Sequence, residues 1–167
     1  MRQTEEPGHF NAPAKGVIVT SSLYDDAGGL DGLQRLSNAF YDRVLADELL
    51  APVFAHFTPT HVEHVAVWLA EVFGGPAEFT EHLGGHHALL RSHLGLEIRD
   101  EHRQRWLQLM ADAISEVFPG RPELAAALMG YFEWGTAIAQ EVSQDPLGTD
   151  LGKPGPTPRW GYQGLVH

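Results

Sequence analysis

The sequence predicts an all-α fold in a single domain with four substantial helices. Three observations support this prediction. The chain has 167 residues, 43% of them apolar, which is enough to bury one core. Paired glycines at 28–29, 74–75 and 84–85 separate segments in which apolar residues recur every three or four positions. No segment alternates apolar and polar residues for more than a few positions, so little or no sheet is expected.

The first two helices follow from their apolar stripes. We expect the first near residues 31–46, with one face made of Leu33, Leu36, Phe40 and Val44. The second has a clear start, because Thr58 can cap it and Pro59 suits its first turn. The stripe of the second helix comprises Val62, Val65, Leu69, Val72 and Phe73.

The third and fourth helices lie in the second half of the chain. The third opens near Asp100 and stops by Pro119 and Gly120, and the fourth begins after Pro122. The stripe of the third comprises Trp106, Met110, Ala113, Ile114 and Val117. The stripe of the fourth comprises Leu124, Leu128, Tyr131, Gly135 and Ile138. Both patterns have the spacing of a helix with one buried face.

The two ends differ in composition from the middle. Residues 145–167 hold four prolines and five glycines, and the first residues are mixed and polar. We therefore expect an N-terminal extension at 1–21, a helical domain at 22–143 and a Pro/Gly-rich tail at 144–167. The start of the chain does not resemble a signal peptide, and the apolar runs are too short to span a membrane. A cytoplasmic location is expected.

Charge and cysteine content exclude several function classes. Eleven basic and twenty-two acidic residues give a formal charge of −11, which argues against nucleic acid or an anionic membrane as partner. The chain has no cysteine, which excludes disulfides, thiol nucleophiles, iron–sulfur clusters and thiolate-ligated or thioether-linked haem. Any metal or cofactor must be held by histidine, carboxylate or packing.

One histidine, His93, lies between two apolar runs in the segment "LLRSHLGLEI". A neutral imidazole in apolar surroundings needs partners for both nitrogens, for example a backbone carbonyl and a metal. Haem iron bound by a single histidine fits a chain without cysteine, and a buried structural histidine is the alternative. His61 and His64 have a spacing compatible with zinc, but no third ligand stands at a matching distance.

Four stretches resemble the group II truncated haemoglobins, which have a two-over-two helical globin fold. They are "NAFYDRVLADELLAPVF", "EVFGGPAEFTEHLGG", "LLRSHLGLEI" and "RQRWLQLM", and the resemblance spans about residues 22–143. The most specific features are the Gly-Gly-Pro corner and the thirteen residues from His93 to Trp106.

The resemblance implies a non-covalent haem b whose proximal ligand is His93, on an F helix of about one turn. Tyr41 and Trp106 would donate hydrogen bonds to the ligand on the distal side. The residues implied to contact haem are Phe54, His61, Val65, Trp68, Leu69, Arg91 and Trp106, with Arg91 meeting a propionate. Positions 61, 65, 68 and 69 also share one helical face.

Two positions depart from the family pattern. Phe54 stands where the family often has tyrosine, and Phe57 is a rival for the same role beside the haem. His61 stands where a small residue is common, so it could donate to the ligand, ligate iron or face solvent. No catalytic residue is implied.

The implied function is reversible binding of O2, CO, NO or related ligands, with a reductase as a possible partner. A haem peroxidase or NO-detoxifying enzyme would use the same pocket. A cofactor-free helical interaction module is the alternative from another class. The sequence leaves enzymatic activity and oligomeric state open.

Overall fold

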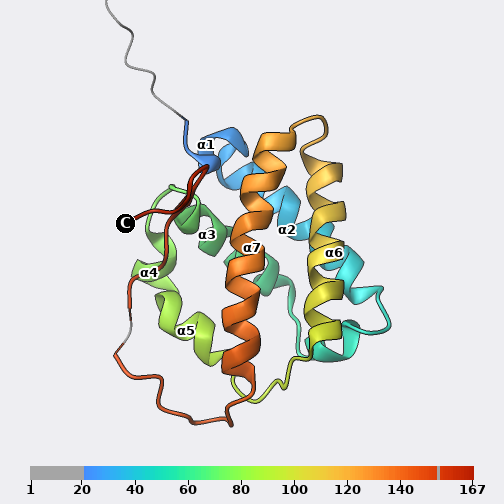
Figure 1. Ribbon diagram of the computed structural model, residues 1–167, viewed down its shortest axis with the longest axis vertical. Helices are drawn as coiled ribbons and strands as arrows, with labels where there is room; N and C mark the ends of the chain where they lie inside the picture. Colours follow the sequence, from blue (N-terminus) through green and yellow to red (C-terminus); the bar gives the residue numbers. More distant parts are fainter. Residues whose placement is uncertain (1–20, 154) are drawn as a thin grey trace, which may run out of the picture.

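The computed structural model describes residues 21–153 and 155–167, so the expected N-terminal extension lies almost wholly outside the described residues. The prediction of an all-α fold is confirmed. The four expected helices are α2 (Gly29–Leu45), α3 (Pro59–Val72), α6 (Asp100–Val117) and α7 (Pro122–Ser143). Figure 1 shows α6 and α7 side by side, with α2 crossing behind them.

The ends of the long helices follow local sequence signals. Helix α3 begins at Pro59 with Thr58 at its N-cap position, but the Thr58 side chain makes no capping hydrogen bond. Instead, the His61 N–H donates to the Thr58 carbonyl at 2.9 Å. The fixed φ of proline therefore starts this helix without help from a hydroxyl cap.

Several short elements connect the long helices. They are α1 (Leu23–Asp26), a 3-10 turn η1 (Ala51–Phe54), α4 (Glu78–His82) and α5 (Gly85–Arg91). The C-terminal segment adds a hairpin in which β1 (Trp160–Gly161) pairs antiparallel with β2 (Gly164–Leu165). None of these elements is long enough to show a periodic apolar stripe, so the sequence did not resolve them individually.

The core lies where α2 packs on α3 and α6, and where α6 packs on α7. All four stripe residues of α2 are buried, and Phe40, Phe73 and Phe132 are among the largest fully buried side chains. Burying one such side chain contributes about 1.5–3 kcal/mol. Helix α5 packs mainly on α4, which leaves open space between α5 and the long helices. None of the described helices is both long and apolar enough to cross a membrane.

Candidate functional site

A cavity of about 520 Å³ lies between the long helices and α5. Its volume falls within the ~300–1,000 Å³ typical of cofactor sites. Its lining is mostly apolar and aromatic, and it also includes six imidazoles. These are His56, His61, His64, His86, His93 and His102. The cavity is therefore an apolar site that contains several nitrogen donors.

His93 lines this cavity from the turn that follows α5. Its Nδ1 lies 2.8 Å from the Leu89 carbonyl oxygen, which can only accept a hydrogen bond. Nδ1 therefore carries the proton, and Nε2 keeps a lone pair that is free to bind a metal. Burial lowers the pKa of His93, and the bond to Leu89 opposes this shift only in part, so the ring is held neutral. Helix α5 has seven residues, more than the single turn expected.

The loop after His93 is joined to the C-terminal end of α7 through Ser143. Ser143 is fully buried, and its carbonyl accepts from the Glu97 N–H at 3.0 Å. Its Oγ accepts from the Ile98 N–H at 3.0 Å and donates to the Gln140 carbonyl at 2.6 Å. One serine thus connects two successive loop amides to the last turn of α7.

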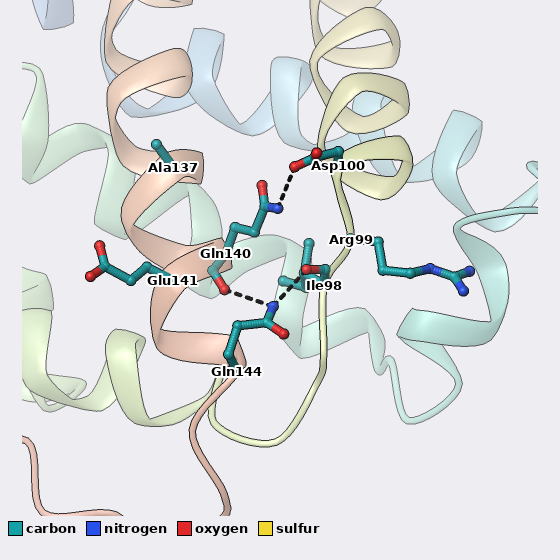
Figure 2. A pocket seen from close by; sticks show the side chains of 7 residues that line it. All are labelled: Ile98, Arg99, Asp100, Ala137, Gln140, Glu141 and Gln144. Carbon is teal, nitrogen blue, oxygen red and sulfur yellow. Dashed lines mark hydrogen bonds between the residues drawn. The ribbon is translucent and has the colours of Figure 1, made fainter.

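Two glutamines reinforce this connection at a shallow surface hollow, which Figure 2 shows. The Gln144 side-chain amide donates to the Ile98 carbonyl at 2.7 Å. The Gln140 amide donates to Asp100 Oδ1, also at 2.7 Å, at the start of α6. The segment that follows His93 is therefore held at several points.

The same loop contains two residues with left-handed backbone. Gly95 has φ +77°, its N–H donates to the Asp145 carbonyl at 2.8 Å, and an added Cβ would lie 3.1 Å from Leu147 Cγ. Glu97 has φ +51°, a conformation that a side chain makes costly. The loop therefore needs glycine at position 95 and accommodates a strained backbone conformation at Glu97.

The opposite side of the cavity is aromatic. Tyr41 stacks on Phe57 with ring centroids 4.7 Å apart and meets Phe54 edge-on at 5.7 Å. The His61 ring lies 5.5 Å from both Tyr41 and Phe57. Burial raises the pKa of Tyr41 well above its usual value, so its hydroxyl stays protonated. Phe54 and Phe57 both line the cavity, and both contact Tyr41.

Two indoles border the cavity as well. Trp106 packs on Phe40 at 4.7 Å and on Phe132 at 5.4 Å, which fixes its ring beside the cavity. The Nε1 of Trp68 is buried and has no hydrogen-bond partner in the described part of the chain. His86 Nδ1 on α5 is likewise buried and unpaired there. Unpaired buried polar atoms are uncommon, and a bound ligand or water molecule would satisfy them.

His61 is exposed and also lines the cavity. Burial lowers its pKa, and repulsion from His64 and His93 lowers it further. A neutral His61 can donate or accept a hydrogen bond. Within residues 21–153 and 155–167, no three His, Asp or Glu side chains converge as a metal centre.

Most of the predicted site residues line this one cavity: Tyr41, Phe54, His61, Val65, Trp68, His93 and Trp106. Leu69 is not among the lining residues, and its contact with haem stays a prediction. Leu69 is fully buried in the core, because it lies about 100° around the helix from Trp68 and faces the neighbouring helices. Arg91 is exposed at the end of α5 and is not part of the lining.

Other lining residues were not identified as site residues from the sequence. Tyr131 was assigned only to the core stripe of the fourth helix, and Trp134, His86 and His102 were not singled out. The stripe of α7 could have shown part of this, since Gly135 and Ile138 continue it beyond the buried core. Ser143 gave no sequence signal of its role.

Comparisons with known proteins show the family of the chain and its fold. The bacterial-like globin family matches residues 22–133. Group 2 truncated hemoglobin YjbI from Bacillus subtilis is 32% identical over 109 residues, which are 65% of this chain and 73% of that protein.

Solved structures are similar over nearly their whole length. The haemoglobin of Chloroflexus aurantiacus has 29% identity and a TM-score of 0.63, covering 74% of this chain and 98% of that one. The truncated oxygen-avid haemoglobin of Bacillus subtilis has 30% identity and a TM-score of 0.63, covering 73% and 98%. The family match ends before the C-terminal hairpin begins.

Proposed function

The chain belongs to the bacterial-like globin family as a group II truncated haemoglobin with the two-over-two fold, and from that premise we propose that it binds dioxygen, CO and NO reversibly at haem iron held by His93. The observation that carries this proposal is the His93–Leu89 hydrogen bond, which leaves one nitrogen of a neutral imidazole free at the cavity. A haem-binding globin follows from the family alone.

The residues present fit a non-covalent haem b. The cavity is large and mostly apolar, as a planar macrocycle requires, and it holds a histidine with a free Nε2. The chain has no cysteine to form thioether links. Val65 and Trp68 would contact the macrocycle from α3, and Arg91 would meet a propionate at the rim. When bound, haem supplies an iron atom with an open coordination position for diatomic ligands.

The distal residues would distinguish among these ligands by hydrogen bonding. The Tyr41 hydroxyl and the Trp106 indole are donors fixed by aromatic packing in surroundings of low dielectric. Donors held in this way stabilise a partly charged ligand more than water does. We assign the main donor roles to Tyr41 and Trp106 and a lesser one to His61, which is exposed.

Membership of a globin family, together with a cavity that His93 lines, argues against the cofactor-free interaction module. Because dioxygen binds ferrous iron, the proposed function requires an electron donor. A reductase is therefore the expected protein partner, and the cytoplasm is its expected location.

An absorption spectrum of the purified protein tests the proposal. We expect a ferric Soret band, a five-coordinate ferrous spectrum after dithionite, and a shifted band under CO. Acid–acetone extraction should remove all the colour, since the haem is not covalently attached. A protein that takes up no haem, or that takes it up without binding CO or O2, would contradict the proposal.

A further inference from the structure

The C-terminal segment packs against the globin domain well beyond the family match. The sequence predicted only an irregular Pro/Gly-rich tail at residues 144–167. Figure 1 shows the chain after α7 turning back and running past α4 toward α1. The segment contacts α1, α4 and α7.

The first contact is with α4. The Thr157 and Thr80 hydroxyl oxygens lie 3.0 Å apart. Thr80 Oγ1 donates its one proton to Glu71 Oε2 at 2.7 Å, so Thr157 is the donor to Thr80. Glu71 is buried on α3, and its other oxygen accepts from the Thr80 N–H at 3.1 Å. A chain of hydrogen bonds thus runs from the C-terminal segment through α4 to a buried carboxylate.

The second contact is at the Gly-Gly-Pro corner between α3 and α4. Arg159 donates to the Gly75 carbonyl at 3.2 Å, and its charge also acts on Glu71. Gly75 has no room for a side chain, because a Cβ would lie 2.7 Å from Tyr24 and 2.8 Å from the Ala70 carbonyl. Arg159 therefore binds a corner whose backbone is already fixed.

The third contact is with α7. Trp160 Nε1 donates to the Ala127 carbonyl at 3.1 Å. Its indole packs on Tyr131 with ring centroids 5.8 Å apart, and on Trp134 at 5.6 Å. Tyr131 and Trp134 themselves line the cavity. Trp160 thus lies directly behind two aromatic rings of the cavity wall.

The hairpin closes the segment on itself and on α1. The Val166 N–H donates to the Arg159 carbonyl at 2.8 Å, and the Tyr162 hydroxyl donates to the Asp26 carboxylate. The residues from Thr157 to Tyr162 are therefore held at both ends.

We propose that residues 157–162 form a clasp that joins α4 to α7, holds Tyr131 and Trp134 in place, and thereby slows the loss of haem. Trp160 and Arg159 are positioning residues, since neither lines the cavity. The proposal rests on the proposed function, because it concerns the retention of the same haem. Helix α4 leads directly into α5, so releasing the clasp would free the segment that carries His93.

The test is the rate at which the ferric protein transfers haem to an excess of apomyoglobin, followed at the Soret band. Trp160→Ala removes two ring contacts and one hydrogen bond, and we expect transfer about tenfold faster, equivalent to about 1.4 kcal/mol. Arg159→Gln should give a smaller acceleration of about threefold. The ferrous five-coordinate spectrum should be unchanged in both variants, because His93 is intact.

A matched control separates the clasp from general destabilisation. Phe118→Leu alters the core outside the cavity lining. We expect it to lower the melting temperature without changing the transfer rate. If Trp160→Ala transfers haem at the wild-type rate, or if Phe118→Leu accelerates transfer equally at equal loss of stability, the clasp proposal is wrong.

A second measurement does not depend on haem. Amide hydrogen exchange of the haem-free protein should speed up about tenfold in α4 and around Tyr131 in Trp160→Ala, while α6 stays protected. Unchanged exchange in α4 would overturn the clasp even if the protein takes up no haem. Absence of haem uptake with faster exchange would instead refute the proposed function and leave the link between α4 and α7 supported.

Discussion

The two sides of the cavity are ordered by different interactions. Around His93, Nδ1 is bound to Leu89, and the following loop is bonded to Ser143 and Gln144. Across the cavity, Tyr41 is held by ring packing, and Trp68 Nε1 has no partner in the described part of the chain. Hydrogen bonds thus orient His93 and the loop that follows it, whereas ring packing orients Tyr41 on the other side. Among the described residues, an unpaired buried nitrogen occurs on each side, at His86 Nδ1 on α5 and at Trp68 Nε1 on α3.

The largest expected effect is at the centre of the proximal side. His93→Ala removes the imidazole whose Nε2 is left free by the bond from Nδ1 to Leu89, so we expect loss of the five-coordinate ferrous spectrum. The measurement is the absorption spectrum of the dithionite-reduced protein. His82→Ala and His87→Ala are the controls, since neither residue lines the cavity. Normal haem ligation in His93→Ala would show that another histidine binds the iron.

On the distal side, Tyr41→Phe and Trp106→Phe should each speed dioxygen release. A hydrogen bond to a partly charged acceptor contributes about 1.5–3 kcal/mol, or roughly ten- to a hundredfold in rate. Release of CO, a less polar ligand, should change less. Stopped-flow dissociation measures both rates. If only His61→Ala accelerates release, His61 is the main hydrogen-bond donor to dioxygen, and Tyr41 and Trp106 do not have that role.

A smaller effect is expected from Ser143→Ala. The change leaves the partly buried Ile98 N–H without its partner, which costs at most about 1–3 kcal/mol of folding free energy. We also expect a shift of the iron–histidine stretching band in the resonance Raman spectrum, because the loop that follows His93 loses an anchor. Ser115→Ala, an exposed position on α6, should leave both the melting temperature and this band unchanged. An unchanged band would show that the hydrogen bond between Ile98 and Ser143 does not affect the orientation of His93.

The smallest effect concerns backbone strain in the same loop. Glu97→Gly relieves a left-handed conformation at a non-glycine residue, but it also increases the entropy of the unfolded chain. We expect a net stabilisation below about 1 kcal/mol by urea titration. Gly95→Ala should have the opposite sign, because its φ is +77° and Leu147 is close. Destabilisation by both changes would mean that Glu97 makes a contact that outweighs the strain.

The sequence predicted what depends on local spacing and missed what depends on distant contacts. The stripes located α2, α3, α6 and α7. His93 stood out because its neighbours are apolar, yet its loop is anchored 45 positions away, at Ser143, which no periodic pattern marks. Leu69 shares a helical face with lining residues in the sequence pattern but is buried in the core, because that pattern does not separate core positions from cavity positions. The prediction that the cofactor is haem came from the family resemblance, because residue spacing alone does not identify a cofactor.

The prolines and glycines of the last residues indicated an irregular segment but not where it would pack. Trp160 and Arg159 find their partners on α7 and at Gly75, far away in the chain. Such contacts depend on the folded surface, which the local composition of a segment does not describe.

The buried carboxylate beneath the clasp links this part of the protein to proton concentration. Burial by itself would raise the pKa of Glu71, but the hydrogen bonds from Thr80, whose hydroxyl accepts in turn from Thr157, and the charge of Arg159 lower it below the usual 4.5. The unfolded chain therefore takes up a proton at a higher pH than the folded one. The stabilisation is fully present above pH 4.5 and is lost as pH falls through the folded pKa. The melting temperature of the wild type should thus fall more steeply with decreasing pH than that of Glu71→Gln. We expect acid to loosen residues 157–162 first, because their hydrogen bonds lead to this carboxylate.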